Sequence, residues 1–361
     1  MQAPRYGTRS LAEVLPSVAH ALGERTFPNA LAFPDMQQAV VVVVDGLGWQ
    51  QLLPHIDSLP NIGPAVLEQQ PIDAAFPTTT PAGLATLTLG MAPGRHGFVG
   101  QTFYLPDFET VLAPLHWESE PLPEAVQPEP TMFERLQSID VRRHGPAQYA
   151  TSGMTRTLLA GATAFDYDEF DPASIGRGEQ QLDYVYLPKL DKLGHIHGAN
   201  TPKWVKYLHR IDELIGGIRR NIGTQAAIVV TSDHGMVTIP DERRINVDEA
   251  PYAAGVDILA GEPRMRHIYS ASPDLVRELW TQELGDRATV WSREEAIASG
   301  VFGDVDDLLA DRIGDVVAIA HDDWILASRI VDPRPSGLRG LHGGLTPAEL
   351  LVPALVIGGV A

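Results

Sequence analysis

The stretch Val41–Gly46, which reads VVVVDG, indicates the fold, because an unbroken run of β-branched residues ends abruptly in a carboxylate and a glycine. Such a run is typical of a strand that is buried on both faces of a sheet. A second stretch, Val229–Gly235, reads VVTSDHG and has the same pattern. In open α/β sheets, ligands bind at the carboxyl ends of the strands. We therefore expect an α/β fold in which two strand ends bring Asp45, Asp233 and His234 to one metal site.

The composition limits which molecules can bind to such a site and which side chains can bind a metal there. The 361 residues suffice for one large α/β domain with a substantial insertion. With 27 basic and 46 acidic residues the net charge is −19, which disfavours binding of a nucleic-acid duplex through its phosphates. A small phosphate substrate stays compatible with this charge, because bound divalent cations reverse the local field. Since the chain has no cysteine, a metal must be bound by Asp, His, Glu or hydroxyl groups.

The sequence predicts neither a targeting segment nor a membrane segment. Glu13 and Pro16 interrupt the apolar core that a signal peptide would need near the N-terminus. The most apolar stretch near the end, Leu350–Ala361, is too short to span a bilayer. We therefore expect a cytoplasmic protein that acts on a small molecule and has no membrane partner. The sequence does not indicate an oligomeric state.

The order of apolar runs predicts two parts of different architecture. A strand over Gln181–Leu187, an amphipathic helix over Lys203–Ile218 and a strand over Ala226–Val230 form a unit that implies parallel strands. Between residues 241 and 325 the pattern is that of a small α+β insertion over the site, with strands at Arg264–Ala271 and Ala288–Trp291, a helix at Pro273–Leu284, and a hairpin of Asp315–Ala320 with Trp324–Ala327. The predicted catalytic domain comprises residues 1–240 and 326–361, and the predicted cap subdomain residues 241–325.

Six acidic and histidine residues border strand-like runs and lie near glycines, namely Asp45, Asp191, His195, Asp233, His234 and His342. Divalent ions such as zinc accept imidazole and carboxylate ligands together, and two ions about 3.5–4 Å apart stabilise both oxygens of an in-line displacement. Each residue alone has an ordinary explanation, since an Asp-Gly step after a strand is usually a turn. Their joint occurrence with the threonine-rich turn Phe76–Thr80, which reads FPTTT, indicates metal-assisted phosphoryl transfer.

This ordered set resembles the alkaline phosphatase superfamily, and within it the type I phosphodiesterase/nucleotide pyrophosphatase branch, over about residues 39–358 except much of the insertion at 241–325. The resemblance implies a three-layer sandwich around a mostly parallel sheet. It also implies that Thr80 is the nucleophile, with Thr78 and Thr79 as alternatives, and that Gln101 holds the phosphoryl oxygen where the family often has asparagine. Two zinc ions are implied, although manganese would also serve. One would be bound by Asp191, His195 and His342, and the other by Asp45, Asp233, His234 and the Thr80 oxygen.

Several functions remain open at this point. The leading hypothesis is a metal-dependent hydrolase of phosphodiester or pyrophosphate bonds. A nucleotide substrate is not supported by Pro81–Gly83, because these residues lack the aromatic that follows the nucleophile in nucleotide-cleaving members. The alternatives are a phosphomonoesterase, phosphonate hydrolase or phosphomutase on the same scaffold, and a non-catalytic, metal-stabilised partner protein. In the insertion, Arg264, Arg266 and His267 are expected either to contact an anionic tail of the substrate or to form a solvated strand face.

Overall fold

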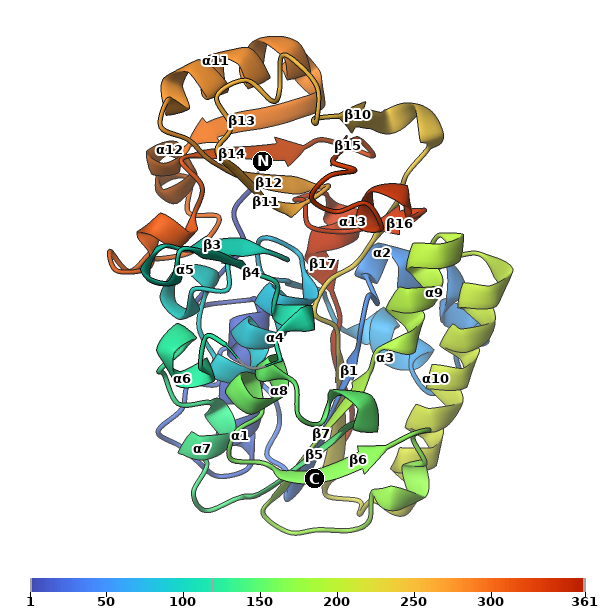
Figure 1. The fold of residues 1–361 in the computed structure, drawn as a ribbon. Helices are drawn as coiled ribbons and strands as arrows, with labels where there is room; N and C mark the ends of the chain where they lie inside the picture. The colour runs from blue at the N-terminus through green and yellow to red at the C-terminus, as the bar shows by residue number, and fades with distance from the viewer. Residues whose placement is uncertain (1, 119, 360–361) are drawn as a thin grey trace.

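A six-stranded sheet lies at the centre of the molecule (Figure 1). The structure, a computed structural model, describes residues 2–118 and 120–359. The strand order is β18-β8-β1-β7-β5-β6, and every neighbouring pair is parallel except β18 and β8. The strands span Gln38–Val44 (β1), Asp140–Pro146 (β5), Thr163–Tyr167 (β6), Gln181–Leu187 (β7), Ala226–Thr231 (β8) and Ala354–Gly358 (β18). The predicted α/β fold with a mostly parallel sheet is confirmed.

Strand β1 occupies the middle of the sheet because its side chains are apolar on both faces. All seven of its residues are buried, and the six that follow Gln38 alternate between two hydrophobic cores. Ala39, Val41 and Val43 belong to one core, whereas Val40, Val42 and Val44 belong to the other. Such a strand contributes most to stability when both of its edges are paired and helices cover both of its faces, because all of its apolar side chains are then buried.

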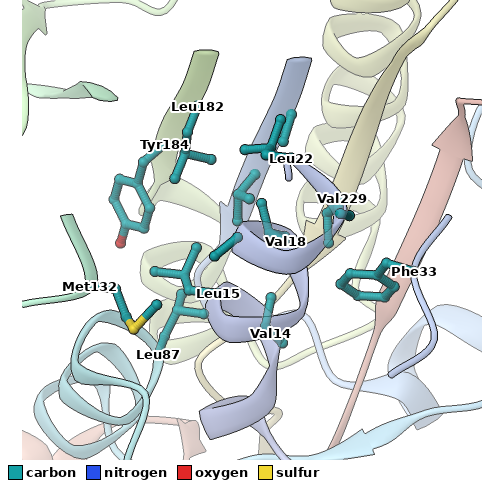
Figure 2. Close-up of a cluster of buried hydrophobic side chains, with 14 of the residues drawn as sticks. Val14, Leu15, Val18, Leu22, Phe33, Leu87, Met132, Leu182, Tyr184 and Val229 are labelled. Carbon is teal, nitrogen blue, oxygen red and sulfur yellow. The ribbon is translucent and has the colours of Figure 1, made fainter. Parts of the chain in front are cut away.

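Helices cover both faces of this sheet, which gives the molecule its three layers (Figure 1). The first core, shown in Figure 2, packs Val14, Leu15 and Val18 of α1 against the sheet near Val229. Its helices are α1 (Val14–Ala21), α4 (Thr80–Leu89) and α7 (Met132–Arg135). The helices on the opposite face are α2 (Trp49–Leu52), α3 (Gly63–Glu68), α9 (Lys189–His197) and α10 (Pro202–Asn221).

The expected strand-helix-strand unit is present, but its two strands are not neighbours. β7 and β8 are both parallel to β1 and pair with its two opposite edges, so that Val41 lies between Tyr184 and Val229. The local sequence pattern of this unit predicts that its two strands run in the same direction. It does not predict that β1, which comes earlier in the sequence, lies between them.

The insertion contains a second sheet of four antiparallel strands, in the order β11-β12-β14-β13. Its elements are β11 (Ile258–Glu262), β12 (Met265–Tyr269), α11 (Pro273–Leu284), β13 (Ala288–Ser292), α12 (Arg293–Ala298) and β14 (Val316–Ala320). The predicted hairpin after β14 is wrong. Both edges of β14 are already paired with β12 and β13, so β15 (Ile325–Ala327) pairs in parallel with β10 (Arg244–Asn246) instead. The domain boundaries at 240 and 326 stay a prediction.

Three short antiparallel pairs lie outside the two larger sheets; two of them connect distant parts of the chain, and the third, β3 with β4, is a local hairpin. They join β2 (Ile72–Asp73) to β17 (Leu351–Val352), β9 (Val237–Thr238) to β16 (Gly340–Leu341), and β3 (Phe103–Leu105) to β4 (Thr110–Leu112). The remaining short helices are α5 (Pro93–His96), α6 (Pro123–Val126), α8 (Gly153–Leu158) and α13 (Pro347–Leu350). Within residues 2–118 and 120–359, no helix has the length and apolarity needed to cross a membrane.

Candidate metal centre

The residues predicted to bind metal lie at the carboxyl ends of the central strands. Asp45 follows β1, and Asp233 and His234 follow β8. Asp191 and His195 lie one helical turn apart on α9, which begins directly after β7. His342 follows β16, and Thr80 is the first residue of α4. The parallel sheet therefore gathers residues that are far apart in the sequence at one edge.

One group of side chains surrounds the imidazole of His234. Its Nε2 atom lies 3.1 Å from the hydroxyl oxygen of Thr80, 3.5 Å from Oδ1 of Asp45 and 3.6 Å from Oδ2 of Asp233. His234 and Asp233 are fully buried, and Asp45 and Thr80 nearly so. The other Asp233 oxygen, Oδ1, accepts hydrogen bonds from the backbone amides of Gly46 and His234, which fixes the carboxylate.

A second group is formed by Asp191, His195 and His342. Nε2 of His195 lies 3.2 Å from Oδ2 of Asp191, and Nε2 of His342 lies 3.8 Å from Oδ1 of the same carboxylate. The two groups are adjacent, because the rings of His234 and His342 stack with their centroids 3.6 Å apart. Asp191 belongs to both, since its oxygens also lie within 4.8 Å of ligand atoms of Asp45 and His234.

The three histidines are oriented in the same way. Nδ1 of each ring lies 2.7–2.9 Å from a backbone carbonyl oxygen, that of Gly340 for His195, Gly235 for His234 and Thr78 for His342. Since a carbonyl only accepts, Nδ1 carries the proton in each neutral ring and the lone pair lies on Nε2. Metal-binding histidines are held by such a contact of their second nitrogen. All three Nε2 atoms face the carboxylate cluster.

The carboxylates of this cluster have oxygens left without hydrogen bonds. Oδ1 of Asp45, Oδ1 of Asp191 and Oδ2 of Asp233 are buried and unpartnered within the described part of the chain. A buried polar atom without a partner costs about 1–3 kcal/mol, and more if it is charged. The residues therefore fit a divalent cation, which would satisfy these oxygens together with the Nε2 lone pairs of the three histidines.

The electrostatics of the cluster also favour a cation. Burial raises the pKa of Asp45 well above its ordinary value, and the neighbouring carboxylates of Asp233 and Asp191 raise it further. Burial likewise raises the pKa of Asp233. For His342, burial and the adjacent His234 lower the pKa well below its ordinary value, so the ring stays neutral. Burial opposes the charges of Asp191 and His195, but their mutual contact lowers the pKa of Asp191 and raises the pKa of His195. The repulsion between the buried carboxylates of Asp45 and Asp233 is what a positive ion would relieve.

Two glycines allow the site to be this compact. Gly46 has φ +73°, and a Cβ atom there would lie 2.9 Å from Cβ of Asp191. A Cβ atom on Gly83 would lie 2.6 Å from the backbone oxygen of Asp233. Only glycine therefore lets the first turn of α4, which carries Thr80, approach the end of β8.

The three threonines of the turn have different partners. Thr79 is the N-cap of α4, and its side chain accepts from the Ala82 amide. The hydroxyl of Thr78 donates to Gly344 O and accepts from the Gly343 amide. Of the three, Thr80 is the one whose hydroxyl contacts His234. The assignment of Thr80 as nucleophile stays a prediction, and these contacts favour it over the two alternatives.

Gln101 lies apart from the contacts described so far. Its backbone amide donates to Oε2 of Glu262 at 3.3 Å. Its side-chain oxygen is buried and has no hydrogen-bond partner among residues 2–118 and 120–359. No hydrogen bond between the described residues joins its amide to Thr80. Its role in holding a phosphoryl oxygen therefore stays a prediction.

Both expectations for Arg264, Arg266 and His267 are wrong, because all three side chains are fully buried and bonded within the protein. Arg264 pairs with Glu349, Arg266 binds the Leu326 carbonyl and Asp332, and His267 binds the Val99 carbonyl. Arg264 lies in the turn before β12, whereas Arg266 and His267 are consecutive residues of β12 and point to opposite faces of its sheet.

One contact of the site was not predicted. The hydroxyl of Tyr186, near the end of β7, donates to Oδ2 of Asp45. A tyrosine five residues before Asp191 is visible in the sequence, but its pairing with Asp45 depends on the register between β7 and β1.

The fold and this cluster define an α/β protein with a candidate metal centre at the carboxyl end of a mostly parallel sheet, and the comparisons specify the family. The sequence matches the model of the type I phosphodiesterase/nucleotide pyrophosphatase family over residues 39–158 and 154–345. The chain belongs to this family, which is part of the alkaline phosphatase superfamily. The predicted family is thus confirmed.

Individual relatives agree with this assignment. A pyrophosphatase/phosphodiesterase of Schizosaccharomyces pombe is 27% identical over 199 residues, which are 48% of this chain and 39% of the relative. Human ectonucleotide pyrophosphatase/phosphodiesterase family member 7 is 24% identical over 281 residues, 65% of this chain and 59% of the relative. The chain thus spans less than two thirds of these relatives.

Among solved structures, an inactive variant of murine ectonucleotide pyrophosphatase/phosphodiesterase 5 in complex with AMP has the same fold. The TM-score is 0.69 at 18% sequence identity, over 90% of this chain and 88% of that chain. The human form of member 5 gives a TM-score of 0.67 at 17% identity, over 89% of this chain and 88% of that one.

Proposed function

We propose that the protein hydrolyses phosphodiester or pyrophosphate bonds with two divalent metal ions and Thr80 as nucleophile. The observation that carries the proposal is the position of the Thr80 hydroxyl, 3.1 Å from Nε2 of His234 and beside carboxylates with unpartnered oxygens. Membership of the type I phosphodiesterase/nucleotide pyrophosphatase family supports the same reaction class.

The chain supplies two sets of ligands for the ions. Asp191, His195 and His342 would hold one, and Asp45, Asp233, His234 and the Thr80 oxygen the other. Asp191 borders both groups, which supports two adjacent ions. The imidazole and carboxylate donors suit zinc, and manganese would also be accepted.

The reaction then follows from the position of Thr80. A bound divalent cation lowers the pKa of a coordinated hydroxyl and neutralises charge on phosphoryl oxygens. Thr80 would lose its proton to water, and its oxygen would bond to phosphorus while the bond from phosphorus to the leaving oxygen breaks. The leaving oxygen takes a proton from water, and a second water molecule hydrolyses the phospho-threonine. Gln101 would donate its amide hydrogens to a phosphoryl oxygen.

The substrate is proposed to be a small phosphoester, and the protein is proposed to act in the cytoplasm. The neighbouring fold in complex with AMP supports a nucleotide as one candidate. Against it, Pro81–Gly83 carry no aromatic side chain next to Thr80. Cell fractionation with an antibody against the native chain tests the location.

Turnover of bis-p-nitrophenyl phosphate tests the reaction. The protein stripped with EDTA should be inactive and should regain activity with zinc or manganese. Thr80→Ala should lower kcat by about 10³-fold or more, because the nucleophile is absent. Zinc content should be nearly unchanged in that variant, and Thr80→Ser, which keeps a hydroxyl, should retain part of the activity.

Other substrates separate the alternatives. A strong preference for p-nitrophenyl phosphate would indicate a monoesterase, and preference for a phosphonate would indicate a phosphonate hydrolase. Full activity of Thr80→Ala would exclude Thr80 as nucleophile. Zinc-loaded protein without activity on any of these compounds would favour the non-catalytic alternative.

A further inference from the structure

A buried ion pair connects the insertion to the segment that carries His342. Arg264 lies in the turn between β11 and β12, and neither it nor Glu349 has any exposed side-chain surface. The pair is bidentate: Nε of Arg264 donates to Oε1 of Glu349 at 2.9 Å, and Nη2 donates to Oε2 at 2.8 Å. Such planar pairs fix the orientation of both partners as well as their distance.

Glu349 in turn holds the loop that precedes it. It is the N3 residue of a capping box with Thr346 at the start of α13. It accepts hydrogen bonds from the Thr346 hydroxyl at 2.7 Å and from the Gly344 amide at 2.9 Å. Burial opposes the charge of Glu349, but Arg264 and these hydrogen bonds lower its pKa below the ordinary value.

The loop held by Glu349 is bonded directly to the threonine turn. The Gly343 amide donates to the Thr78 hydroxyl at 2.9 Å, and that hydroxyl donates to Gly344 O at 2.8 Å. Nδ1 of His342 donates to the Thr78 carbonyl at 2.8 Å. An unbroken series of hydrogen bonds therefore runs from Arg264 through Glu349 and Gly344 to Thr78, two residues before Thr80.

We propose that Arg264 and Glu349 are positioning residues of the metal centre, through which the insertion holds His342 and the Thr80 turn in place. The insertion supplies none of the proposed metal ligands, yet the turn that carries Arg264 contacts α13 through Glu349. The inference rests on the proposed function. It adds that the insertion is required for tight metal binding and for the alignment of Thr80.

The chain offers a matched control for Arg264. Arg266 lies two residues further along, on β12, and is equally buried. Its guanidinium binds the Leu326 carbonyl at 2.6–2.8 Å and Asp332 at 2.9 Å. It therefore connects β12 to the segment that follows the insertion, and not to Glu349. Arg→Lys at either position keeps the charge and removes the bidentate geometry. The two variants therefore disturb the insertion alike but differ in their connection to Glu349.

The experiment measures zinc affinity by competition with a chromophoric chelator, together with kcat and KM for bis-p-nitrophenyl phosphate. Arg264→Lys should weaken zinc binding by about 10- to 100-fold, as expected for groups that orient metal ligands. It should lower kcat more than it raises KM, since Thr80 is misaligned after the substrate has bound. Arg266→Lys should match the wild type in all three quantities.

A second variant guards against loss of folding in the first. Glu349→Gln keeps a carbonyl acceptor for the Gly344 amide but removes the charge, and it should show the same losses as Arg264→Lys. Wild-type zinc affinity and kcat in folded Arg264→Lys or Glu349→Gln would overturn the inference, as would equal losses in Arg266→Lys. A wild-type protein that binds zinc but hydrolyses no phosphoester would overturn the proposed function alone, and the affinities would still decide the inference.

Discussion

Histidines of this chain are distinguished by the nitrogen that carries the proton. In His195, His234 and His342, Nδ1 faces a carbonyl and Nε2 faces the carboxylate cluster, where Nε2 of His234 also contacts the Thr80 hydroxyl. In His96 and His267 the order is reversed. Nδ1 accepts from a backbone amide, that of Phe98 or Gly314, while Nε2 donates to an oxygen. Both nitrogens of the second group are used within the protein, so these rings are structural, whereas the first group retains a lone pair for a ligand.

Tyr186 gives a prediction about single hydroxyl groups. Because its hydroxyl donates to Oδ2 of Asp45, Tyr186→Phe leaves the carboxylate freer to turn away from a metal ion. We expect zinc affinity, measured by chelator competition, to fall about 10-fold or more. Tyr184→Phe is the control, since the Tyr184 hydroxyl is buried with no hydrogen-bond partner in the described part of the chain. Equal affinities of the two variants would contradict a role for Tyr186 in orienting Asp45.

Predictability at this scale depends on whether a contact is local in the sequence. The Asp191/His195 spacing of one helical turn could be recognised from the sequence, as could Asp233 and His234 after an apolar run. The partners of Arg264 could not, because Glu349 lies 85 residues away and the pairing depends on the folded insertion. A pattern of residue types shows candidate ligands, but not the groups that hold them in place.

At the scale of secondary structure, the first turn of α4 determines where Thr80 lies. The helix begins with Thr79 as N-cap and Pro81 in the first turn, both favourable there. It continues to Leu89 and ends at Gly90 with φ +67°. Its position relative to β8 is set by Gly83, which packs against the backbone of Asp233.

Substitution of Gly83 tests this contact. A Cβ atom there would approach Asp233 O to 2.6 Å, and a backbone oxygen cannot rotate away as a side chain does. Gly83→Ala should therefore cost about 1–3 kcal/mol of stability and move Thr80 from His234, with a fall in kcat of about 10²-fold. Urea denaturation and steady-state kinetics measure the two effects.

Gly145→Ala is the matched control for this substitution. A Cβ atom on Gly145, in β5, would meet no described heavy atom within 4 Å. This variant should keep wild-type kcat. A fall in kcat as large as that of Gly83→Ala would show that close packing of α4 on β8 is not the cause.

The elements themselves were predictable where the pattern was long. The helix Pro273–Leu284 was predicted with its observed limits, and the strand Gln181–Leu187 likewise. The hairpin after Ala320 was not, because short apolar runs do not reveal which edge of a sheet is free. Strand order depends on pairing between residues that are far apart in the sequence, so local periodicity does not predict it.

At the scale of the whole molecule, three carboxylates near a single centre oppose folding unless a cation is bound. Asp45, Asp191 and Asp233 are proposed ligands and come from three different strand-end segments, so an ion bound to them would connect distant parts of the chain. Zinc at 100 times its dissociation constant should stabilise the protein by about 2.7 kcal/mol, or roughly 3–4 °C in Tm for a chain of this length. Differential scanning calorimetry with EDTA and with zinc measures the shift. A Tm that is independent of zinc would contradict a structural contribution of the metal.

Acid stability depends on the buried structural histidines, of which His267 is the most direct test. Burial lowers its pKa to about 4, below the value of about 6.5 expected in the unfolded chain. The unfolded state therefore binds the proton first, so stability is present above pH 6.5 and is lost as the pH falls toward 4. One such proton costs about 1.4 kcal/mol of stability per pH unit within this window.

His267→Gln should be less stable than the wild type at pH 7 but should lose less stability on acidification. Urea denaturation at pH 7.0, 5.5 and 4.5 measures the difference, with His116→Gln at an exposed position as control. If His267→Gln and the wild type lose the same free energy of unfolding between pH 7.0 and 4.5, groups other than His267 determine the acid sensitivity of the protein.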